Sequence, residues 1–129
     1  MKQITLEWLK SAKEDILVIE RIISDYHLSN MVAFHSQQCS EKCFKALIEE
    51  HELHFVKTHD LLKLYDLVRK YISVKDLDIL TTIADLYTDS RYPTMSGILP
   101  DGKPTIIQAN HFYKFAEEIY KQIDILLKQ

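Results

Sequence analysis

Apolar residues recur every three or four positions near both ends of this 129-residue chain, and this spacing constrains the fold more than any other feature. A 3-4-3-4-3 rhythm places such side chains on one face of a helix. We therefore predict a long amphipathic helix after Thr5 and another after Thr105, where Thr105 and Gln108 form a capping box. The two runs are Leu9, Ala12, Ile16, Ile19, Ile23 and Tyr26, then Ala109, Phe112, Ala116, Ile119, Ile123 and Leu126.

Between these runs the sequence predicts a second helix at about 29–53 and two shorter ones. Thr58 is expected to cap the third helix, with Asp60 in its first turn. Ser73 with Asp76 resembles a capping box for the fourth, whose apolar stripe is then Leu77, Leu80, Ala84 and Tyr87.

Both glycines and all three prolines lie between Pro93 and Pro104. We expect a long loop at about 89–104, and loops of this length in compact domains are usually functional or mobile. No alternating apolar and polar run is long enough to predict a strand. The sequence therefore predicts a single all-α domain over residues 1–129, an up-and-down bundle of four or five helices.

The composition, with 47% hydrophobic and 27% charged residues, is that of a globular protein. A net charge of −3 gives no general attraction to nucleic acid or anionic membrane, so any phosphate recognition must be local. No apolar run approaches the roughly 20 residues that span a bilayer. The start of the chain also lacks the apolar region of a secretory signal, so we expect a cytoplasmic protein with no membrane contact.

The stretch FHSQQCSEKCFKAL, Phe34 to Leu47, carries the first candidate site. On a helical wheel, His35, Gln38, Lys42 and Lys45 fall within about 80° of one another. Two ammonium groups, an imidazole and an amide donor in a row suit the oxygens of a phosphate. The alternative is a solvated face in which Glu41 and Lys45 form an i, i+4 ion pair.

A different face of this helix is rich in small residues and allows a neighbouring helix to approach closely. We expect Cys39 and Cys43 to be buried and unlinked there, with a metal or redox pair as the alternative. Phe44 and Ile48 extend the apolar surface further, which favours a second contact such as a homodimer. The small-residue face comprises Val32, Ser36, Cys39, Ser40, Cys43, Ala46 and Leu47.

Two other segments carry candidate residues. The histidines at 51, 54 and 59 lack the HExxH arrangement of a zinc site, so no metal is expected, and Thr58-His59-Asp60 is typical of a helix start. Arg91 and Tyr92 follow the fourth helix, where a guanidinium fork and an aromatic ring suit an anionic ligand. With only two glycines there is no Gly-rich phosphate loop, no G-x-S-x-G elbow occurs, and no cofactor is expected.

Taken in order, these segments resemble the HEPN family of small helical domains, named for higher eukaryote and prokaryote nucleotide binding. The resemblance covers about residues 6–119 and is specific as a combination. It is carried by Trp8, Ala12 and Asp15-Ile16, then FHSQQCSEKCFKAL, then THDLLKL at Thr58 to Leu64, and SRYP at Ser90 to Pro93.

The resemblance implies a helical bundle that is commonly a homodimer and often pairs with a minimal nucleotidyltransferase, in arrangements resembling toxin–antitoxin systems. Some members are metal-independent ribonucleases with an Arg-x4–6-His motif in the final core helix. Here no histidine follows Arg91 at that distance, and the matching pair Arg21 and His27 lies in the first helix.

The sequence thus favours a non-catalytic module that binds a nucleotide, an RNA or a partner protein. The alternatives are an endoribonuclease toxin and a purely structural interaction module. The candidate ligand-binding residues are Arg91, Tyr92, His35, Gln38, Lys42, Lys45 and His59.

Overall fold

The predicted all-α class is confirmed by a computed structural model that describes residues 1–54, 57–91 and 103–128, without the side chains of 87–91. These residues form helices only, with no strand among them. The elements are α1 (Gln3–Ile22), the short 3-10 helix η1 (Tyr26–Leu28), α2 (Ser29–Glu50), α3 (Leu61–Val68), α4 (Leu77–Arg91) and α5 (Ile106–Leu127).

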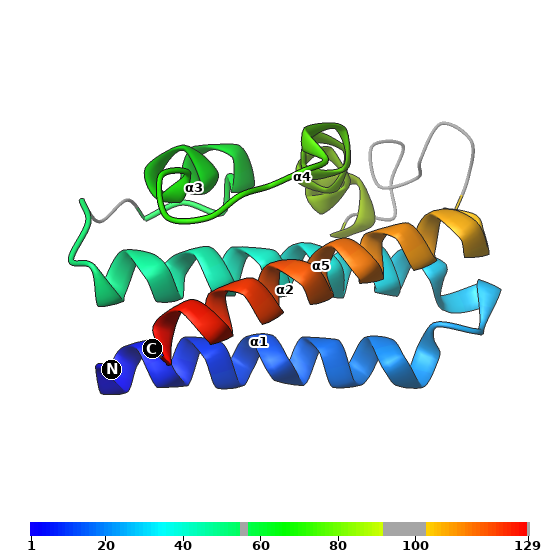
Figure 1. Ribbon diagram of the computed structural model, residues 1–129. Coiled ribbons are helices and arrows are strands. Elements are labelled where there is room, and N and C mark those ends of the chain that lie inside the picture. The colour runs from blue at the N-terminus through cyan, green and yellow to red at the C-terminus, as the bar shows by residue number, and fades with distance from the viewer. Residues whose placement is uncertain (55–56, 92–102, 129) are drawn as a thin grey trace.

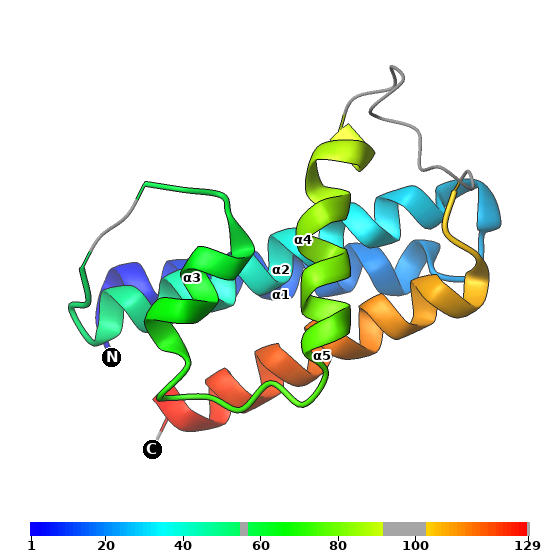
Figure 2. The same cartoon turned by 90° about the horizontal axis from the view of Figure 1, so that it is seen from above.

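The three long helices pack together, and the two short ones cover α2 and α5 on the side away from α1 (Figure 1). Helices α1 and α2 are antiparallel neighbours joined by η1, and α5 lies beside both of them (Figure 1). Helix α3 lies over the C-terminal half of α2 (Figure 2). Helix α4 crosses α5 and α2, and its C-terminal end extends past α2 on the side away from α5 (Figure 2).

Helix α2 is the centre of this arrangement, because it packs against α1, α3, α4 and α5. The predicted small-residue face is buried throughout. Phe44 is also buried, with the ring of Tyr65 from α3 at a centroid distance of 6.1 Å. Ile48 is buried as well. The apolar surface that favoured a second molecule is therefore covered within the same chain.

The two cysteines are buried and free, as the sequence predicts. Burial raises the pKa of the Cys43 thiol well above its ordinary value, and a hydrogen bond with Cys39 raises it further. The Cys39 thiol donates a weak hydrogen bond to the carbonyl of Ala116 on α5, at 3.9 Å. Thiols in this state pack as small apolar groups and are poor nucleophiles.

The start of α1 differs from the prediction, which placed it after Thr5. The helix begins at Gln3, and Thr5 is buried inside it. Its cap comes from the far end of α2, where one carboxylate oxygen of Glu50 accepts from the Lys2 backbone N–H at 2.9 Å and from the Thr5 hydroxyl at 3.0 Å. At its other end α1 stops at Ile22, and Tyr26 belongs to η1, where it is exposed.

The remaining helix ends were predicted with mixed success. Thr105 and Gln108 form the predicted capping box of α5. Helix α2 ends at Glu50 and not at 53, because the chain turns through Glu52 with a left-handed φ of 50°. The cap of α3 is Asp60, which accepts from the N–H groups of Leu62 and Lys63.

Helix α4 starts later than the Ser73 box would place it. It begins at Leu77, where Asp76 accepts from the Ile79 N–H. The Ser73 backbone instead pairs with the side-chain amide of Gln122 on α5. The buried stripe of α4 runs through Leu80, Ile83 and Leu86, whereas Leu77 is exposed. The helix also continues through residues 89–91, which were predicted as loop.

Candidate functional site

The first polar cluster joins α1 to α2 around Asp15. This aspartate lies beside the apolar stripe of α1, and its side chain is only 8% exposed. One carboxylate oxygen contacts Nδ1 of His35 at 2.8 Å, and the other accepts from Nζ of Lys42 at 2.8 Å. His35 and Lys42 are seven positions apart, so two turns of α2 bring both to the same carboxylate.

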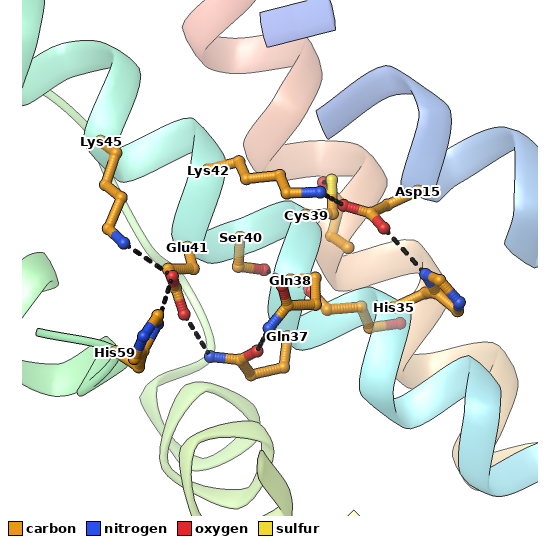
Figure 3. Close-up of polar contacts among 12 residues, drawn as sticks. Asp15, His35, Gln37, Gln38, Cys39, Ser40, Glu41, Lys42, Lys45 and His59 are labelled. Carbon is orange, nitrogen blue, oxygen red and sulfur yellow. Dashed lines mark hydrogen bonds and ion pairs between the residues drawn. The ribbon is translucent and has the colours of Figure 1, made fainter. Parts of the chain in front are cut away.

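The second cluster forms around Glu41, whose side chain is 5% exposed. One oxygen of Glu41 accepts from Nζ of Lys45 at 2.8 Å and contacts Nδ1 of His59 at 2.9 Å. The other oxygen accepts from the side-chain amide of Gln37 at 3.0 Å. The amide of Gln38 donates in turn to the Gln37 oxygen at 2.7 Å. Figure 3 shows the two clusters side by side on α2, between α1 and α4.

We call this surface the polar face: His35, Gln38, Lys42, Lys45 and His59, with the supporting residues Asp15, Gln37 and Glu41. A buried carboxylate is stable only with partners that compensate its charge, and each of the two carboxylates here has one lysine and one histidine. Each lysine ammonium has three N–H donors and uses one of them on its carboxylate. The cations are therefore fixed in position and keep donors for a further anion.

The structure thus brings together five of the predicted ligand-binding residues. The alternative of a solvated face is correct in one respect, since Glu41 and Lys45 do form the i, i+4 pair. It is wrong in another, because Glu41 is buried and also contacts His59 from the segment before α3.

Sequence reasoning gave no role to Asp15 or Gln37. The available signal for Asp15 was a charged residue placed between the apolar positions Ala12, Ile16 and Ile19 of a helix. For Gln37, the signal was its i, i+4 spacing to Glu41. The signal for Asp15 does not reveal its partners His35 and Lys42 on α2.

The last two candidates lie at the edge of the described structure. Arg91 is the final residue of α4, and its side chain is not described. Tyr92 lies outside the described residues, as does most of the predicted loop at 89–104. The end of α4 extends past α2 on the side away from α5 (Figure 2). The Cys39 contact shows that the small-residue face of α2 packs against α5.

The described residues contain no group of three or more histidine, cysteine or acidic side chains arranged to hold a metal ion. His51 instead stacks on Tyr71, with ring centroids 4.1 Å apart. None of the helices in the described part of the chain is long and apolar enough to cross a membrane.

The fold is that of an all-α domain of the HEPN type. The family model for the HEPN domain matches residues 5–126. An archaeal HEPN homologue of known crystal structure superposes with a TM-score of 0.68 and 26% sequence identity, over 96% of this chain and 97% of that one. No curated protein matches the chain significantly. The chain belongs to the HEPN domain family.

Proposed function

We propose that this HEPN protein is a non-catalytic, dimeric module that binds a nucleotide or an RNA end through the polar face. We further propose that it pairs with a minimal nucleotidyltransferase in a toxin–antitoxin-like system. One observation carries the binding proposal: two buried carboxylates fix two lysines and two histidines on one face of α2. An array of positioned N–H donors suits phosphate oxygens, because little side-chain entropy is lost when the anion binds.

The proposal assigns the strongest single contribution to Arg91. Its helix, α4, passes beside the polar face in Figure 3 and extends past α2 in Figure 2, and a guanidinium can engage two phosphate oxygens at once. Each lysine of the polar face is a point charge that already pairs with a buried carboxylate. A hydrogen bond to a charged group contributes about 1.5–3 kcal/mol.

Calorimetric titration of the full chain with nucleotides and short RNAs tests the proposal. Arg91→Ala should weaken binding by roughly tenfold to a hundredfold. Lys42→Ala should have a smaller effect that appears mainly as an altered salt dependence. Lys63→Ala on α3, whose side chain has no ion pair among the described residues, is the matched control, and circular dichroism checks that each variant is folded.

If the parent protein binds no nucleotide or RNA, the proposal is wrong and a protein-interaction role replaces it. If Lys42→Ala loses binding while Arg91→Ala does not, the lysines of the polar face are the main contacts.

A second candidate, a metal-independent endoribonuclease, is favoured by the contact between Asp15 and His35. A carboxylate on Nδ1 orients a histidine ring and leaves Nε2 for proton transfer to or from a ribose hydroxyl. The same RNAs, incubated with the protein and a chelator and then separated by size, distinguish the two. Cleavage that disappears in His35→Gln would favour the enzyme over the binding module.

A further inference from the structure

A cavity of about 220 Å³ lies next to the polar face, between the first half of α1, the end of α2 and the segment that enters α3. Its wall is mainly apolar and includes Trp8, Ile48 and Leu64. Lys45, Lys57 and His59 line it as basic groups. The cavity and the polar face therefore share Lys45 and His59, and neither was assigned to a cavity from the sequence.

We infer that this cavity holds a single nucleobase, with one phosphate directed to Lys57 and the adjoining polar face. The inference rests on the proposed function and names the chemistry that the same site takes. A base attached to one phosphate is found both in a free nucleoside monophosphate and at the 5′-phosphorylated end of an RNA, and the cavity fits either source.

The size of the cavity favours one ring system. Pockets for drug-sized ligands span about 300–1,000 Å³, so a cavity of about 220 Å³ takes a base but not a dinucleotide. Trp8 supplies an aromatic surface, and Nζ of Lys45 lies 5.3 Å from the centroid of its ring. Stacking of a base on an aromatic ring tolerates different bases, because every base has a π-face.

The charges around the cavity favour one phosphate over a polyphosphate. Glu49 lines the cavity together with the lysines. Lys45 and His59 are already paired with the carboxylate of Glu41. Lys57 has no ion-pair partner among the described residues, which makes it the cation most available to a ligand. The site thus has a local positive group without a large positive excess, and ATP should bind no more tightly than AMP.

The wall at Trp8 offers a hydrogen-bond donor that the protein itself does not use among the described residues. The indole N–H is buried and has no hydrogen-bond partner in the part of the chain that the structure describes. The ring is therefore held by packing and by Lys45, with no directional bond to fix it. Trp8 is also the only tryptophan in the sequence, so its fluorescence reports directly on this cavity.

The test is a fluorescence titration of the full chain with AMP, with a 5′-phosphorylated tetraribonucleotide, and with ribose 5-phosphate, which lacks the base. AMP or the oligonucleotide should change the Trp8 emission in a saturable way, and the tighter of the two identifies the source. Ribose 5-phosphate should have no such effect at the same concentration. By calorimetry, Lys57→Ala should weaken binding by roughly two- to fivefold, as expected for an exposed charge pair. Lys63→Ala should leave it unchanged.

Three outcomes would overturn the inference, and they separate it from the proposed function. Equal responses to AMP and ribose 5-phosphate would show that no base enters the cavity. Calorimetric binding of a nucleotide or RNA, with unchanged Trp8 emission and an unaffected Lys57→Ala, would move the ligand elsewhere and leave the proposed function standing. Absence of calorimetric binding for every nucleotide and RNA would remove both.

Discussion

Two carboxylates, Asp15 and Glu41, determine the chemistry of the polar face more than its exposed cations do. Each is almost fully buried, and a buried carboxylate without partners costs several kcal/mol. The basic side chains are therefore held by the demands of the fold, whether or not a ligand is present. This also explains why α2 places two lysines and a histidine in a central helix that is otherwise largely buried.

The Asp15 cluster can be tested by Asp15→Asn, which keeps the shape of the side chain and removes its charge. Lys42 and His35 then lose their counter-charge, but both are partly exposed, so water reduces the penalty. We expect the free energy of unfolding to fall by about 1–3 kcal/mol, below the full cost of breaking a buried pair. Urea denaturation followed by circular dichroism measures this change.

The matched control for that variant is Asp66→Asn, which breaks an exposed pair with Arg69 at 3.4 Å. Surface pairs of this kind contribute about 0–1 kcal/mol, so the control should be close to the parent protein. Equal losses in the two variants would mean that burial of Asp15 has no energetic consequence.

The common face of the site residues could be predicted from the sequence only where one helix holds them. His35, Gln38, Lys42 and Lys45 share a face because of the helical period alone. Asp15 and His59 reach that face from other elements, and no spacing within the sequence encodes such a contact. The burial of Glu41 was missed for the same reason, since it depends on the segment that precedes α3 and on its position beneath Lys45 and His59.

Among the elements, the contact between the start of α1 and the end of α2 has the most informative chemistry. Lys2, the residue before α1, offers no side-chain cap, and Glu50 supplies one from the end of the antiparallel helix. Its hydrogen bonds from the Lys2 backbone N–H, and secondarily from the Thr5 hydroxyl, lower the pKa of the Glu50 carboxyl below its ordinary value of 4.5. A carboxylate at a helix N-terminus is also favoured by the helix dipole.

Glu50→Gln should therefore destabilise the protein at neutral pH and have little effect in acid. A lowered folded-state pKa contributes stability that is present above the unfolded pKa and lost as the pH falls through the folded one. The contribution at pH 7 should be about 0.3–1 kcal/mol, because Glu50 is partly exposed. Thermal unfolding from pH 7 to pH 3 measures the difference. Glu52→Gln, at a highly exposed position, is the control and should show no such dependence.

The long helices could be predicted well from the sequence and the starts of the short ones could not. Helices α1 and α5 each bury their apolar stripe over several turns, so the periodic signal is strong. Helices α3 and α4 have short or mixed stripes, and several residues near their starts are possible caps. Asp60 and Asp76 prevail over Thr58 and Ser73, and Ser73 is drawn instead to Gln122 of α5. That tertiary contact has no local signal.

For the whole molecule, the position of α2 gives the domain two different sides. One face of α2 packs against α5 through small residues, and a different face carries the polar face. The end of α4 extends past α2 on the side away from α5 (Figure 2). A ligand on the polar face would contact α2 and the segment before α3, which carries His59.

The oligomeric state is the last property that the arrangement of the whole molecule bears on. Phe44 and Ile48 no longer argue for a dimer, because the chain itself covers them. The expectation of a dimer now rests on the homodimers that HEPN domains commonly form and on the distribution of exposed apolar side chains. Leu17, Val18, Tyr26 and Leu28 are exposed in the second half of α1 and in η1, and Met1, Ile4 and Leu6 are exposed near the start of the chain. Exposed apolar side chains of this kind are available to a partner surface.

We therefore expect a homodimer that uses the junction of α1 and η1, with a mass by light scattering of twice the 15.2 kDa of one chain. The double variant Leu17→Glu and Tyr26→Asp should have the mass of one chain, because two related copies of each new charge would meet at an isologous interface. Both side chains are about half exposed, at 48% and 50%, so the monomer should keep its fold. Ile125→Glu, on the exposed side of α5, is the control and should remain dimeric.

A parent protein with the mass of one chain at micromolar concentration would show that the dimer prediction is wrong. Dissociation by Ile125→Glu alone would place the interface on α5. The part of the polar face that borders α1 would then be accessible to a ligand in the dimer.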